Sequence, residues 1–100
     1  MLTKKYSNMA LSLDEYRTKL INKILFSRSQ DEVSRFIETA IKALEQNKIN
    51  GHIISRFVDK TISELELFNP LNKDAQQWSN ILMAKILFNR IRQKMSTVTH

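Results

Sequence analysis

The chain contains a single glycine, Gly51, and a single proline, Pro70, among its 100 residues. In an average protein these two residue types together make up roughly 12% of the chain. Sheet sandwiches and barrels need many tight turns, and phosphate-binding loops need several glycines for close backbone approach. A chain with so few turn-forming residues has little room for such folds. The sequence therefore predicts an all-α protein.

Turn signals divide the chain into segments that have the apolar spacing of amphipathic helices. The links between them are about four or five residues long, which makes consecutive helices antiparallel neighbours. We therefore expect a four-helix up-and-down bundle, with its long last helix as the source of any irregularity. The expected helices cover Leu13–Ser27, Gln30–Gln46, Gly51–Phe68 and the stretch after Asn72 up to Met95.

The expected helices begin at side chains that accept hydrogen bonds from the free N–H groups of a first turn. In a capping box, a serine at the start is joined by a glutamate three residues later. The third helix should end at Phe68, because Asn69, the residue before Pro70, is disfavoured in the helical conformation. The expected caps are Ser12 with Glu15, Ser29 with Glu32, Asn50 and Asn72.

These helices form one expected domain, residues 12–96. The preceding residues 1–11 are either an arm or a helical extension, because apolar residues continue backwards at helical spacing through Met9 and Tyr6. Residues 97–100 form a C-terminal tail.

The last expected helix has more apolar faces than a helix in a small bundle needs to bury. Either this helix lies centrally and is covered from several sides, or its surplus apolar face binds a partner. Its core stripe holds Ile81, Ala84, Phe88, Ile91 and Met95; a second face holds Ala75, Trp78, Leu82 and Ile86; Met83 and Leu87 fall in a third sector.

The surplus face leads us to expect a small protein-interaction module. A two-fold homodimer is the commonest closed assembly, and another helical protein is the other expected partner. Tryptophan and arginine are frequent high-energy contacts in interfaces. The predicted interface residues are Trp78, Leu82, Ile86, Leu87, Arg90 and Arg92.

Catalytic and metal-binding motifs are missing from the sequence. The chain has no cysteine and two histidines, His52 and His100, so we expect no metal site and no cofactor. Its neighbouring carboxylates lie at expected helix starts or on polar faces, where capping and solvent account for them. One enzyme alternative stays open: a small helical enzyme acting on an anionic substrate, with Arg17, Lys85 and Asn89 near apolar seams.

The net charge of +6 is unevenly distributed. Residues 1–28 and 73–100 have a basic excess, whereas residues 29–72 have an acidic excess. The basic residues Arg90, Arg92 and Lys94 make association with nucleic acid an alternative function, although no helix-turn-helix spacing accompanies them.

No apolar stretch approaches the roughly 20 residues of a bilayer span, and no secretory signal is apparent. We therefore expect a cytoplasmic protein without a membrane partner.

Overall fold

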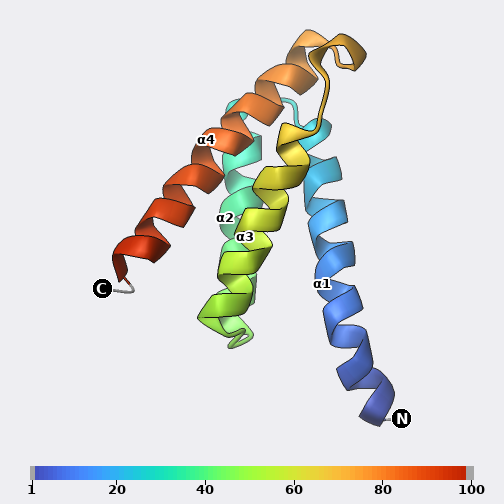
Figure 1. The fold of residues 1–100 in the computed structure, drawn as a ribbon. Coiled ribbons are helices and arrows are strands. Elements are labelled where there is room, and N and C mark those ends of the chain that lie inside the picture. Colours follow the sequence, from blue (N-terminus) through green and yellow to red (C-terminus); the bar gives the residue numbers. More distant parts are fainter. Residues whose placement is uncertain (1, 99–100) are drawn as a thin grey trace.

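The computed structural model describes the backbone of residues 2–98 and the side chains of residues 13–95. In this part of the chain the fold is all-α, with four helices packed against one another (Figure 1). The predicted fold class is thereby confirmed. The elements are α1 (Leu2–Leu25), α2 (Gln30–Gln46), α3 (Gly51–Glu66), the short 3-10 helix η1 (Pro70–Asn72) and α4 (Ala75–Val98).

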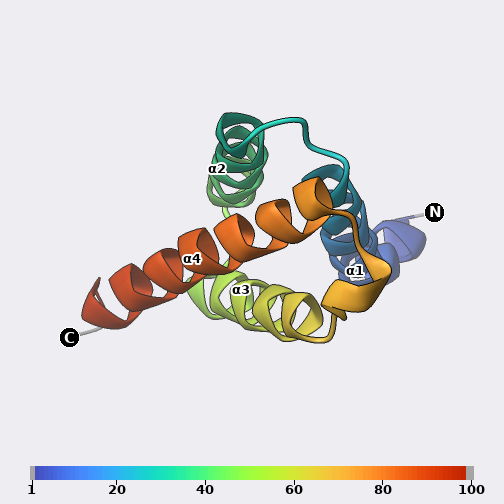
Figure 2. The ribbon, with the colours of Figure 1, turned by 90° about the horizontal axis from the view of Figure 1, so that it is seen from above.

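The packing is organised around α4. This helix packs against α1, α2 and α3, whereas α2 and α3 barely contact each other. Figure 2 shows α4 running obliquely between α2 and α3, with α1 near its first turns. The helices alternate in direction (Figure 1), so the up-and-down order is present, but the oblique α4 makes the bundle irregular.

The core forms where α4 meets the other helices. Ile81, Ala84 and Phe88 are completely buried, as expected for the predicted core stripe of this helix. Fully burying an isoleucine or phenylalanine side chain stabilises the fold by roughly 1.5–3 kcal/mol. The facing helices contribute buried apolar side chains to the same cluster: Leu20, Ile21, Ile24 and Leu25 from α1; Val33, Ile37, Ala40 and Leu44 from α2; Ile54, Phe57, Val58, Ile62 and Leu65 from α3.

The first helix is longer than the predicted one. It begins at Leu2, so Ser12 lies inside α1 and the expected capping box of Ser12 with Glu15 is wrong. The helix follows the apolar spacing that runs back from Leu13. Ser12 therefore lies inside the helix, where the N–H groups that follow it already have partners in the preceding turn. Of the residues 1–11, position 1 lies outside the described part of the chain, and the others extend α1.

The N-terminal part of α1 extends beyond the N-terminal end of its neighbour α3. The two helices run in the same direction (Figure 1), and the rings of Tyr16 and Phe57 lie 6.1 Å apart between centroids. Because both helices rise equally per residue, Gly51 at the start of α3 lies near the level of position 10 in α1. The backbone of residues 2–10 therefore projects beyond α3.

The caps of α2 and α3 lie where the sequence predicts them. The Ser29 hydroxyl accepts from the backbone N–H of Glu32 at 3.2 Å, and the Asn50 side chain accepts from the backbone N–H of His52 at 2.7 Å. The Glu32 carboxylate accepts from the backbone N–H of Arg28 rather than from that of Ser29. Both helix starts are thus fixed by local side-chain hydrogen bonds.

The link before α4 differs from the prediction. α3 ends at Glu66, and Asn69 caps η1 by accepting from the backbone N–H of Leu71. Asn72 is not the cap of α4, because it belongs to η1. The Asp74 carboxylate instead accepts from the backbone N–H of Gln77 at 2.7 Å, and the Gln77 side chain accepts from the Asp74 N–H at 3.3 Å. This pair is a reciprocal capping box.

A buried asparagine ties α4 to the turn between α1 and α2. Asn80 is completely buried, and its amide donates to the carbonyl oxygens of Leu25 at 3.3 Å and Ser27 at 2.8 Å. Its own oxygen accepts from Gln76 at 2.9 Å. The terminal carbonyls of a helix have no partner within the helix, so Asn80 satisfies groups that burial would otherwise leave unpaired.

We predict that Asn80→Ala lowers the free energy of unfolding by about 2–4 kcal/mol, because a buried carbonyl without a partner costs roughly 1–3 kcal/mol. Urea denaturation measures the change. Asn22→Ala, at an exposed position of α1, is the matched control and should change stability by less than about 0.5 kcal/mol. A loss for Asn80→Ala as small as that of the control would contradict the anchoring role.

The turn that follows α2 contains a strained residue. Lys48 has a φ of 59°, and the Ile49 N–H donates to the Leu44 carbonyl at 3.1 Å. This is the geometry of a Schellman motif, in which glycine is favoured because a Cβ atom is disfavoured in the left-handed conformation.

Lys48→Gly should therefore raise the free energy of unfolding by about 1 kcal/mol. Lys42→Gly, on the exposed face within α2, should lower it by a similar amount because glycine disfavours a helix interior. Thermal unfolding followed by circular dichroism compares the two variants. Destabilisation by both glycines would show that the left-handed geometry carries no cost here.

Candidate functional site

The structure divides the six predicted interface residues into groups. Leu82 is 43% exposed and Ile86 is 50% exposed, so both lie on the outside of α4. Trp78 and Leu87 are partly buried and pack against the core. The charged Arg90 and Arg92 are exposed. The prediction that these residues bind a partner remains a prediction.

The central position of α4 accounts for much of its apolar surplus. α4 packs against all three other long helices, and Met83 in the third sector packs against the core together with Trp78 and Leu87. Only Leu82 and Ile86 are large apolar side chains of α4 that the structure describes as exposed. Packing against the core accounts for Trp78, Met83 and Leu87, whereas the partner explanation for Leu82 and Ile86 stays a prediction.

The exposed pair lies within a longer line of residues along α4. Positions that alternate by four and three residues form one narrow face of a helix, which is the spacing of a coiled-coil seam. At 1.5 Å per residue, this line is roughly 27 Å long. We call it the α4 seam; it consists of Ala75, Ser79, Leu82, Ile86, Asn89 and Gln93.

Each side of the α4 seam has its own flank. The first flank holds Trp78, Lys85 and Arg92, and the second holds Gln76, Met83 and Arg90. The cations of these flanks have no anionic side chain to pair with on their own helix, because α4 contains no aspartate or glutamate.

Two of the flanking cations have contacts within the molecule. The Lys85 ammonium lies 5.6 Å from the ring centroid of Trp78, which is the arrangement of a cation–π contact. Arg92 lies 3.7 Å from the Asp59 carboxylate of α3 and donates to the Asn89 side chain at 2.6 Å. The first flank is thereby held in place beside the α4 seam.

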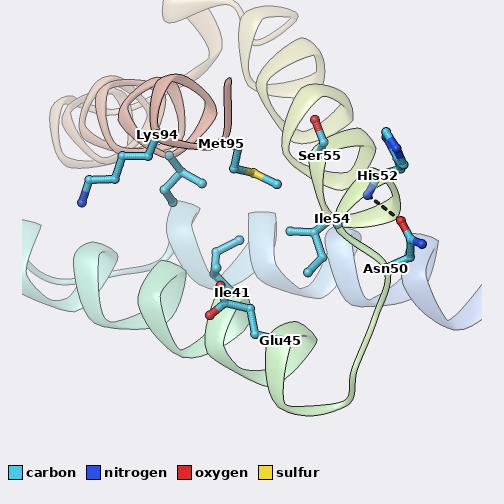
Figure 3. A pocket seen from close by; sticks show the side chains of 10 residues that line it. Ile41, Glu45, Asn50, His52, Ile54, Ser55, Lys94 and Met95 are labelled. Carbon is cyan, nitrogen blue, oxygen red and sulfur yellow. Dashed lines mark hydrogen bonds between the residues drawn. The ribbon is translucent and has the colours of Figure 1, made fainter. Parts of the chain in front are cut away.

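A pocket of about 660 Å³ opens between α2, α3 and the last turns of α4 (Figure 3). Its apolar lining comes from all three helices and includes Ile41, Ile54, Ile91 and Met95. The sequence holds no signal for this pocket, because the opening depends on the oblique course of α4, and no local pattern indicates a crossing angle between helices.

The polar groups of this pocket do not form a catalytic arrangement. Figure 3 shows Glu45 on α2 pointing away from His52 and Ser55, which lie on α3. Acid–base or nucleophilic catalysis needs such groups within hydrogen-bond reach of one another or of a shared substrate atom. Among the side chains that the structure describes, no group of three or more histidine, aspartate or glutamate residues is placed to hold a metal ion.

Arg17, a cation considered for the enzyme alternative, is held by two carboxylates. Its guanidinium donates to Glu64 of α3 at 2.7 Å and to Asp14 at 2.9 Å. Burial by itself lowers the pKa of Arg17, but the hydrogen bonds and charges of these two carboxylates outweigh it and raise the pKa above its usual value. This arginine links α1 to α3 and has its charge already compensated.

Comparison of the chain with protein-family models, curated proteins and solved structures finds no match. Within the described residues, none of the helices has the length and apolar character needed to cross a bilayer.

Substitutions at neighbouring positions should separate the outer face of α4 from its core. We expect Leu82→Asp to keep the helical circular dichroism signal and to lower the free energy of unfolding by about 1 kcal/mol or less, since this side chain is already partly solvated. Phe88→Ala should cost about 3–5 kcal/mol, because it empties a completely buried site. Urea denaturation of both variants tests the difference. Unfolding of Leu82→Asp would place Leu82 in the core.

Proposed function

We propose that this chain is a small protein-interaction module that binds a partner helix along the α4 seam. The observation that carries the proposal is the exposure of Leu82 and Ile86 in the middle of that seam. Leaving such side chains in water forgoes up to roughly 1.5–3 kcal/mol for each, and an adjacent pair of exposed apolar residues is typical of a binding surface.

The shape of the α4 seam favours a helix as the bound element. Ala75 and Ser79 are small, so a second helix has room to approach closely beside the first turns of α4. Two side chains alone bury far less than the roughly 800 Å² per partner of a typical specific interface. A helix lying along the whole seam extends the contact to Gln93, and Leu82 and Ile86 then occupy its centre, where high-energy contacts concentrate.

Association with nucleic acid is less well supported. It rests on the cations near the end of α4, but Arg92 is already beside Asp59. Arg90 and Lys94 lie one turn apart and present two charges, whereas tight non-specific binding to DNA involves several phosphate contacts.

The test uses Trp78, the only tryptophan of the chain, as a fluorescent reporter beside the α4 seam. The ligands are three tryptophan-free amphipathic peptides of equal length, with leucine at the seam positions and glutamate, glutamine or lysine at the flanking positions. We expect saturable one-to-one binding of at least one peptide, or self-association of the chain in sedimentation equilibrium.

The double variant Leu82→Ser/Ile86→Ser should weaken that association at least about tenfold, because about 1.4 kcal/mol of lost contact energy is one factor of ten. Ile53→Ser is the matched control, since Ile53 is also 43% exposed but lies on α3. The absence of any association, or equal weakening by the control, would contradict the proposed function.

A further inference from the structure

We propose that the α4 seam selects a helix with acidic flanks and disfavours a second copy of this chain. The inference rests on the proposed function, because it concerns the partner of the same surface. Three observations carry it: the exposed Leu82 and Ile86, the cationic flanks on both sides of them, and the lack of any acidic residue on α4.

A parallel pair of α4 helices would bring like charges together. In a parallel coiled coil, a flank residue that directly precedes a seam residue, as Lys85 precedes Ile86, lies opposite the flank residue five positions later on the other helix. Lys85 of one copy would then face Arg90 of the other copy, and the two-fold symmetry would repeat the contact. Like charges at such positions are destabilising, so this arrangement is disfavoured.

An antiparallel pair fares no better. In that orientation each flank faces the same flank of the other copy. In the register that pairs Leu82 of one copy with Ile86 of the other, Lys85 would meet Lys85 of the other copy. With no carboxylate on α4, neither orientation provides an opposite charge from the seam helix itself.

The acidic contact of Arg92 does not change this balance. Asp59 lies beside Arg92 and compensates that charge from α3. Lys85 contacts the Trp78 ring, which carries no net charge, and Arg90 is exposed and forms no ion pair with an acidic side chain among residues 13–95. Lys85 and Arg90 thus flank Leu82 and Ile86 with positive charge that a partner has to compensate.

A partner helix with carboxylates beside its apolar stripe fits these features. Its apolar residues would cover Leu82 and Ile86, and its glutamates would face Lys85 and Arg90. Each exposed ion pair contributes modestly to the binding free energy. An acidic flank attracts Lys85 and Arg90 and a basic flank repels them, so the two positions together separate the affinities of the two kinds of helix. Charge therefore decides which helix binds, while the apolar pair supplies the contact.

Titration of Trp78 fluorescence with the three peptides tests the selection. We expect the glutamate-flanked peptide to bind about tenfold more tightly than the lysine-flanked one at low salt, with the glutamine-flanked peptide between them. The ratio should shrink at 0.3 M salt, because salt screens exposed charges. Sedimentation equilibrium of the chain alone should give the mass of a monomer.

The charge-reversal variant Lys85→Glu/Arg90→Glu should invert the order, so that the lysine-flanked peptide binds best. Arg35→Glu/Lys42→Glu is the matched control, because it changes the net charge equally but lies on the exposed face of α2, and it should keep the original order. Arg92 stays unchanged in both variants because it contacts Asp59.

The outcomes separate this inference from the proposed function. Equal binding of all three peptides that still depends on Leu82 and Ile86 would overturn the charge selection and leave the interaction module standing. A dimer of the wild-type chain that the double serine variant dissociates would do the same. Loss of the preference in the α2 control as well would show that only net charge matters and overturn the selection by flank residues. Binding that ignores Leu82 and Ile86 would overturn both proposals.

Discussion

The fold depends on the contact of α4 with all three other helices. Since α2 and α3 barely touch, α4 joins them through a shared core to which it contributes Ile81, Ala84 and Phe88. Asn80 fixes the position of α4 along the bundle, because its amide is the donor for carbonyls at the end of α1 and in the following turn. A shift of α4 by one turn would leave those carbonyls unpaired in a buried site, which is costly.

The same constraint shapes the outer surface. Because α4 packs against three other helices, apolar side chains in more than one of its sectors contact the core. The side that remains free still carries Leu82 and Ile86, and its flanks carry only positive charge. Burial explains the apolar residues on the covered sides but gives no reason for the exposed pair. The exposure of Leu82 and Ile86 is therefore the basis of the proposed interaction.

Sequence patterns predicted the parts of the fold that depend on local interactions. The apolar spacing of α2 and the caps Ser29 and Asn50 are set within a few residues, so their prediction needed no tertiary information. Ser12 was assigned to a helix start because its residue type fits a cap, yet α1 begins at Leu2. At the start of α4, Asp74 with Gln77 also fits a capping box, and this signal was available in the sequence beside Asn72.

The candidate site was only partly predictable for a physical reason. Helical spacing places Trp78 and Leu82 on one apolar face of α4, and it contains no information on how far a neighbouring helix covers that face. The oblique course of α4 buries part of Trp78 and leaves Leu82 exposed. The pocket lined by Ile41, Ile54 and Ile91 arises from the same crossing geometry, which depends on long-range packing of three helices.

Thiol labelling tests this account most directly, because the chain has no cysteine of its own. Single cysteines would replace Leu82, Ile86, Ile81 and Phe88 in turn, at a concentration where the chain is monomeric. We expect Leu82→Cys and Ile86→Cys to react at nearly the rate of an unstructured peptide thiol. Ile81→Cys and Phe88→Cys should react at least about a hundredfold more slowly, since their labelling requires opening of the fold. Equal rates at all four positions, or protection of positions 82 and 86 in the monomer, would contradict the arrangement of α4 on which both proposals rest.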